Sequence, residues 1–221
     1  LNTTSTLYQN DEVSGEAVLE NYSKTYGIAE EMLAQNPNSS RYQKLVETLD
    51  KIFEASGAAT CENLIALYKP RFEDNQDDKE LVNKIIGLLE GSRCKDSDFY
   101  MQVNVRLNEI DPTPEHAHHL AELYYGDENI DKAIQYFKQA IKLQEDKEKK
   151  AGYYMQLAQI AYGDLNDMPT SRGYARNAAE LDPDNGRPYI LIGRMYAESV
   201  NQCGSDDFEK KAVLWAAVDK F

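Results

Sequence analysis

Apolar side chains recur every three or four residues along most of the chain, which is the period of a helix with one buried face. Val18, Tyr22 and Tyr26 show this spacing in the first such segment. No stretch alternates apolar and polar residues as a half-buried strand would. The sequence therefore predicts an all-α protein. The predicted helices span residues 15–36, 39–55, 60–72, 78–90, 97–110, 114–126, 129–145, 148–163, 170–181, 186–200 and 207–221, after a polar N-terminal segment at 1–14.

Several predicted helix boundaries carry capping residues. Thr113 precedes Pro114, which fits an N-cap followed by proline in the first helical position. Asp77 and Glu80 have the spacing of a capping box. These short breaks predict many helices joined by short loops.

An internal repeat shows how the helices are organised. Residues 120–127 read Leu-Ala-Glu-Leu-Tyr-Tyr-Gly-Asp, and residues 157–164, 37 positions later, read Leu-Ala-Gln-Ile-Ala-Tyr-Gly-Asp. A second predicted helix follows each copy. One helix pair cannot bury its apolar face alone, so such pairs are expected to stack, with small residues such as Ala121, Ala133 and Ala140 allowing close approach.

The repeated positions resemble the tetratricopeptide repeat, whose pattern is W-x2-L-G-x2-Y in one helix, A-x3-F-x2-A in the next, and a proline after it. Matching positions are Ala117, Leu120, Ala121, Tyr124, Ala133, Phe137 and Ala140 in one unit, Leu157, Ala158, Ser171, Ala175, Ala178 and Pro183 in the next, and Tyr189, Ile192, Gly193 and Tyr196 in a third. The resemblance implies an all-α, right-handed α-α superhelix, a tetratricopeptide-type solenoid of stacked antiparallel helix pairs.

The resemblance divides the chain. Residues 112–221 carry the tetratricopeptide pattern, with the last repeat cut short: Ala217 and Phe221 fit its second helix, after an insertion around 199–207. Residues 15–111 are predicted to be degenerate helical repeats. There, 42–49 fits a first helix, whereas 78–90 fits the pattern poorly.

In this family, the first helices line a concave face that binds extended peptides or partner helices. The resemblance therefore implies a peptide-binding groove. Its candidate residues are His118, Glu122, Tyr125, Met155, Gln159, Tyr162, Arg187, Ile190 and Arg194. An alternative for Tyr125 and Tyr162 is that they pack between helices. Such a mixture of Tyr, Met, Gln and Arg suits an uncharged or amphipathic segment.

Composition and charge narrow the choice of partner. The chain has 24 Lys and Arg against 38 Asp and Glu, a net charge of -14. A protein so acidic repels phosphate backbones and anionic lipids, which argues against nucleic-acid and membrane-surface partners. No apolar run is long enough for a membrane span. The protein or peptide partner that the resemblance implies is consistent with this charge.

No catalytic residue, cofactor or metal site is predicted. His116, His118 and His119 are the only histidines, and a metal site would need further converging ligands. The acidic stretches 73–78 and 206–207 lack EF-hand spacing and fit helix N-termini better.

The three cysteines, Cys61, Cys94 and Cys203, include no C-x2-C pair, so a zinc ribbon is excluded. Cys61 and Cys94 lie 33 residues apart, about one repeat. Equivalent positions in stacked units lie roughly 10 Å apart, beyond disulfide reach. We therefore expect two buried thiols, the alternative being a bridge formed in an oxidising compartment.

The sequence predicts a non-catalytic scaffold that binds a peptide or partner protein in the concave groove of the solenoid, rather than an enzyme. The alternative is a carbohydrate-binding accessory protein at a bacterial cell envelope. That alternative requires aromatic side chains on an open surface, whereas Trp215 has the position of a packed residue. The chain starts at Leu1 without Met, and we expect it to be part of something longer. The resemblance to bacterial repeat modules suggests a periplasmic or cell-envelope location, with a cytoplasmic one as the alternative.

Overall fold

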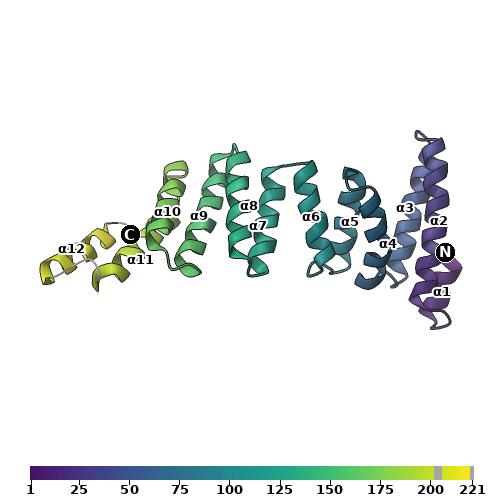
Figure 1. Cartoon of the computed structure of the whole chain (residues 1–221), viewed down its shortest axis with the longest axis horizontal. Coiled ribbons are helices and arrows are strands. Elements are labelled where there is room, and N and C mark those ends of the chain that lie inside the picture. The colour runs from purple at the N-terminus through teal and green to yellow at the C-terminus, as the bar shows by residue number, and fades with distance from the viewer. Residues whose placement is uncertain (202–205, 220–221) are drawn as a thin grey trace. The chain divides into compact units, whose positions relative to one another are not determined.

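The computed structural model describes residues 1–201 and 206–219, and all regular structure in these residues is helical (Figure 1). The eleven helices predicted from the sequence are all present, with ends that agree within three residues. Cys203 and Phe221, both named in the sequence analysis, lie outside the described residues. The helices are α1 (Asn2–Gln9), α2 (Gly15–Gln35), α3 (Ser40–Ala55), α4 (Cys61–Asp74), α5 (Lys79–Gly91), α6 (Asp98–Ile110), α7 (Pro114–Gly126), α8 (Ile130–Leu143), α9 (Lys147–Gly163), α10 (Met168–Leu181), α11 (Gly186–Glu198), the 3-10 turn η1 (Ser199–Asn201) and α12 (Asp207–Val218).

The chain forms two compact units, Leu1–Ile110 and Asp111–Phe221. We call them the N-terminal and C-terminal units. In both, the main packing partners are helices next to or near each other in the sequence. This local packing is typical of a repeat architecture.

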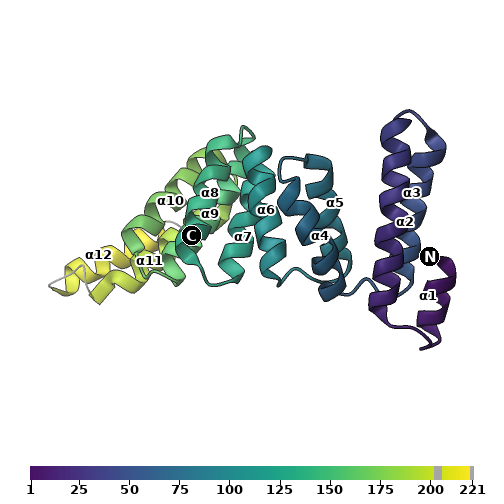
Figure 2. The same cartoon turned by 45° about the vertical axis from the view of Figure 1, so that its right-hand side comes forward.

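The N-terminal unit begins with a helix that the sequence analysis missed. Residues 2–9 were assigned to a polar segment, yet they form α1 beside the long α2–α3 hairpin (Figure 2). Two side-chain hydrogen bonds link it to the hairpin: Asn21 Nδ2 donates to Thr4 Oγ1 at 2.9 Å, and Gln9 Nε2 donates to the Ala55 carbonyl at 3.2 Å. A helix held in this way lacks the apolar period on which the prediction relied.

The role predicted for 42–49 is wrong. This segment lies in α3, which packs mainly against the preceding α2 rather than starting a pair with α4. Leu45, which the motif would bury, is 39% exposed, although Leu49 is buried. The match to a first helix therefore reflected ordinary amphipathic spacing.

The expectation of two free thiols is also wrong, because Cys61 and Cys94 form a disulfide with their Cα atoms 5.4 Å apart. Cys61 is the first residue of α4, and Cys94 lies in the turn after α5. In that turn, Arg93 has a φ of 59°, and the Cys94 amide donates to the Leu89 carbonyl at 2.8 Å. The turn brings Cys94 back over the end of α5, which the 10 Å spacing of regular loops did not allow for.

Helix caps explain most of the boundaries. Thr113 Oγ1 accepts a hydrogen bond from the His116 amide, which confirms the predicted N-cap of α7. The predicted capping box at Asp77 is wrong by one residue, since Asp78 caps α5 and Asp77 instead pairs with Arg106. Either aspartate has a side chain short enough to cap, so local sequence alone did not distinguish them.

The C-terminal unit is built from the helix pairs α7–α8 and α9–α10, followed by α11 and α12, which lie in chain order (Figure 1). Small residues lie where the paired helices come closest. Ser171 on α10 is fully buried and donates to the Ala158 carbonyl on α9 at 2.8 Å. Ala121, Ala133 and Ala140, which were expected to allow close approach, are buried, which confirms that part of the prediction. The pattern positions Ala158, Ala175 and Ala178 are buried as well.

The last helix differs from the prediction at Trp215. Its side chain is 59% exposed and contacts Phe208 edge to face, with ring centroids 6.3 Å apart. At the start of the same helix, Asp206 Oδ1 accepts from the amides of Phe208 and Glu209. That contact confirms the helix N-terminal role expected for this acidic stretch.

Candidate peptide-binding groove

The first helices of the C-terminal unit, α7, α9 and α11, carry three adjoining hollows on one face. We call this face the groove. The arginine hollow is lined by Met155, Gln159, Arg187, Ile190, Leu191 and Arg194. The histidine hollow is lined by His118, Lys149, Gly152, Tyr153, Met155, Gln156, Gln159, Asn185 and Arg187. The tyrosine hollow is lined by Glu122, Tyr125, Phe137, Gln156, Gln159 and Ile160. Gln159 lines all three hollows, so they adjoin one another around this side chain.

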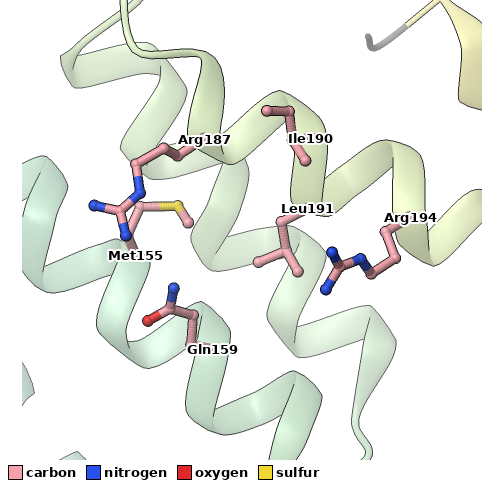
Figure 3. Close-up of a pocket in the computed structure, with 6 residues that line it drawn as sticks. All are labelled: Met155, Gln159, Arg187, Ile190, Leu191 and Arg194. Carbon is pink, nitrogen blue, oxygen red and sulfur yellow. The ribbon is translucent and has the colours of Figure 1, made fainter.

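The arginine hollow, of about 190 Å³, lies between α9 and α11 (Figure 3). Arg187 and Arg194 come from α11 and lie at opposite ends, with Leu191 between them. Leu191 and Met155 belong to the buried core, whereas Ile190 is 48% exposed. The hollow therefore has an apolar floor with a cation at each end.

The histidine hollow, of about 430 Å³, is held in shape by contacts between α7 and α9. The ring of His118 stacks on Tyr153 with centroids 4.6 Å apart, and its Nε2 lies 2.8 Å from Gln156 Oε1. The Glu122 carboxylate is 3.7 Å from the same nitrogen, as their spacing on one helix face predicts. These three neighbours hold the His118 imidazole in place, and it forms part of the wall of the histidine hollow.

The hydroxyl groups of two tyrosines connect the first helices α7, α9 and α11 in succession. Tyr125 Oη donates to Asp164 Oδ2 at 3.2 Å, and Tyr162 Oη donates to Glu198. Burial raises the pKa of Tyr125, and Asp164 raises it further; burial and Glu198 do the same for Tyr162. Both hydroxyls are therefore protonated donors at neutral pH, and each connects one first helix to the end of the next.

The structure brings eight of the nine residues predicted for the groove into these hollows, all except Tyr162. Tyr162 instead bridges α9 and α11 through its hydroxyl, while Tyr125 both bridges helices and lines a hollow. Peptide binding by these residues stays a prediction.

Sequence reasoning missed several lining residues. They are Phe137, Lys149, Gly152, Tyr153, Gln156, Ile160, Asn185 and Leu191. Gln156 and Leu191 each directly follow a predicted residue, and Phe137 comes from a second helix. The family pattern names one stripe per first helix, whereas a hollow between two helices exposes neighbouring positions too.

The described parts of the chain offer no group of three or more His, Cys, Asp or Glu side chains that could hold a metal ion. His116 Nδ1 lies 2.8 Å from the Asp111 carbonyl oxygen, so this imidazole is held at the start of α7. None of the helices in residues 1–201 and 206–219 has the length and apolar character needed to cross a membrane.

The helical pairs and their packing define the chain as an all-helical solenoid of the tetratricopeptide type. A crystal structure of MamA protein aligns at a TM-score of 0.50 and 17% identity, covering 73% of this chain and 79% of that one. A second MamA crystal structure aligns at 0.49 and 15%, covering 79% and 92%. BtubC (BKLC) from P. vanneervenii aligns at 0.44 and 13%, covering 94% and 91%. At these identities, the first alignment supports the fold alone.

No family model matches the chain, and no curated protein sequence matches it significantly.

Proposed function

We propose that the protein is a non-catalytic scaffold that binds a segment of a partner protein in the groove. The observation that carries this proposal is the set of three hollows that adjoin at Gln159, lined mainly by the first helices α7, α9 and α11. Such a surface combines an apolar floor with a few polar groups, which suits recognition of a helix or an extended segment.

The groove is built to keep its shape. Tyr125, Tyr162 and His118 each link neighbouring first helices through their polar atoms. A surface held rigid before binding loses less conformational entropy when a partner docks, so more of the contact energy appears as affinity.

The test is capture of partners by the full chain from an extract of its own cells. The groove variant replaces Tyr125, Gln159 and Arg194 by Ala. The matched control replaces Arg176, Asn177 and Glu180, three exposed residues of α10, by Ala. We expect partners held by the wild type and the control to be lost with the groove variant. Partners retained at full strength by the groove variant would exclude the groove as the binding site.

Glycan binding is the second candidate, favoured by one observation: Trp215 and Phe208 are exposed together on α12. Their ring planes are inclined by 88°, so they do not form a single flat platform for a sugar ring. Because Trp215 is the only tryptophan, a change in tryptophan fluorescence on adding oligosaccharides would support this candidate. An unchanged spectrum would remove it.

A further inference from the structure

We infer that the groove selects an acidic amphipathic helix, one that carries two carboxylates seven residues apart with an apolar side chain between them. This inference rests on the proposed function and names the chemistry of the partner. It comes from the distribution of charge around the arginine and histidine hollows.

These two hollows are unusual in a chain with a net charge of -14. Together they are lined by Lys149, Arg187 and Arg194, and among the described residues no aspartate or glutamate lines either of them. Lys149 reaches outward to Glu115 at 3.3 Å. No ion pair with a carboxylate is found for Arg187 or Arg194 in residues 1–201 and 206–219. The arginine and histidine hollows are thus locally positive on a protein whose net charge is negative.

The overall negative charge does not cancel this local preference. At physiological ionic strength, interactions between exposed charges are largely screened beyond about 8 Å. Arg187 and Arg194 lie in the wall of the hollow itself, where a bound carboxylate would be in direct contact with them. A guanidinium can also hold a carboxylate through two parallel hydrogen bonds, which adds geometric selectivity to the attraction.

The spacing of the arginines sets the spacing of the ligand. Arg187 and Arg194 are two helical turns apart on α11, which corresponds to about 10.5 Å along the axis. The hollow is lined by residues of α9 and α11, and we take the ligand to lie along α11. A helical ligand has the same rise per residue, and its side chains at positions i and i+7 therefore match both arginines.

The surface between Arg187 and Arg194 indicates which side chain the ligand carries between its two carboxylates. Met155, Ile190 and Leu191 form an apolar surface there, and Gln159 supplies one polar group. An apolar residue at i+3 or i+4 of the ligand would lie over this surface. The two ends are not equivalent, since Arg194 also interacts with Tyr162, whose hydroxyl is bonded to Glu198. We expect Arg187 to contribute more selectivity than Arg194.

The test is selection of peptides on the immobilised full-length protein from a displayed library of short helix-forming peptides with randomised surface positions. We expect enriched sequences to carry Asp or Glu seven residues apart, with Leu, Ile, Met or Phe between. The best peptide, measured by fluorescence anisotropy, should lose about tenfold in affinity with Arg187→Gln, less with Arg194→Gln, and nothing with the control Arg176→Gln. Its binding should also weaken with added salt.

The possible failures can be told apart by a further variant, Ile190→Asp, which places an acid on the apolar floor. Enriched peptides without paired acids, whose binding is lost with Ile190→Asp but kept with both arginine variants, would overturn the inference and leave the groove as the binding site. Enriched peptides insensitive to all three variants, or no enrichment at all, would overturn both the inference and the proposed function.

Discussion

At the scale of single residues, the least expected feature is a polar cluster inside the N-terminal unit. Tyr22 Oη donates to Asp50 and lies 3.1 Å from Tyr68 Oη, and Lys84 Nζ bonds both Asp50, at 3.1 Å, and Tyr26. These five side chains come from α2, α3, α4 and α5. The cluster therefore joins four helices through hydrogen bonds in a largely buried place.

Burial shifts the ionisation of this cluster. It raises the pKa of Tyr22, Tyr26 and Tyr68 well above that of an exposed tyrosine, and the Asp50 carboxylate adds to the rise. Burial also lowers the pKa of Lys84, although Asp50 opposes that change. The folded state therefore holds the protons of these tyrosines more tightly than the unfolded chain does.

We predict that the protein loses stability as the pH rises above about 10, the usual pKa of tyrosine. In that range the unfolded chain releases tyrosine protons that the folded chain retains, so the free energy of unfolding falls with pH. Lys84 acts in the opposite sense, because the unfolded state holds its proton to higher pH. Denaturant unfolding followed by circular dichroism at a series of pH values measures the slope.

The variant Tyr22→Phe removes one of these groups and should make the slope shallower, by up to about 1.4 kcal/mol per pH unit. The comparison uses the slope because the variant also loses two hydrogen bonds and is less stable at neutral pH. Equal slopes for the variant and the wild type would show that Tyr22 does not hold its proton more tightly when folded.

Sequence reasoning predicted two of the five residues of this cluster. The periodic spacing of Tyr22 and Tyr26 correctly marked them as buried. It gave no sign that their hydroxyls would meet, or that Asp50 and Lys84 would point inward. Helical periodicity identifies the buried face of one helix, whereas this cluster depends on how four helices are rotated against one another.

At the scale of elements, the boundaries were predictable because prolines and capping side chains act locally. Sequence reasoning missed α1 and gave α3 the wrong role for the same reason. Whether each segment is a helix of a given pair depends on the helix it packs against, and not only on its own residues. The residues that line the groove also divide into those that one helix alone predicts and those that depend on the neighbouring helix. The family pattern predicted one stripe of residues on each first helix, but Tyr153 and Gln156 also line the groove because the histidine hollow lies against residues of both α7 and α9.

The Cys61–Cys94 disulfide links the start of α4 to the turn after α5 and closes a loop of 33 residues. In the chain-entropy model, a loop of this length stabilises the folded state by roughly 3 to 4 kcal/mol. We predict a loss of about this size in the double variant Cys61→Ser, Cys94→Ser, measured by denaturant unfolding. With reductant present, which opens the bridge in the wild type, the difference between the two proteins should shrink.

The same bridge predicts a labelling pattern. Alkylation of the denatured protein without reductant should modify Cys203 alone, and all three cysteines after reduction. Disulfides persist in oxidising compartments, so the bridge should form when the protein is made there. Three labelled cysteines without reductant, in protein from such a compartment, would show that the bridge does not form.

At the scale of the whole molecule, stability is distributed along the chain. Each helix packs mainly on its neighbours in sequence, and the contacts separate into the units Leu1–Ile110 and Asp111–Phe221. The net charge of -14 is spread over side chains along both units and is not concentrated in one acidic tail. Stability in repeat architectures is approximately a sum over neighbouring elements, which allows one part to open without the rest.

We therefore predict that a core cavity destabilises only the unit that contains it. Leu64 on α4 and Leu157 on α9 are both almost completely buried, and replacing either by Ala should cost about 2 to 5 kcal/mol locally. Hydrogen exchange with peptide-level resolution should show faster exchange in α2 to α6 for Leu64→Ala and in α7 to α11 for Leu157→Ala. Faster exchange throughout the chain in either variant would mean that the two units unfold as one. Because the groove lies wholly in the C-terminal unit, Leu64→Ala should then leave capture of partners intact while Leu157→Ala weakens it.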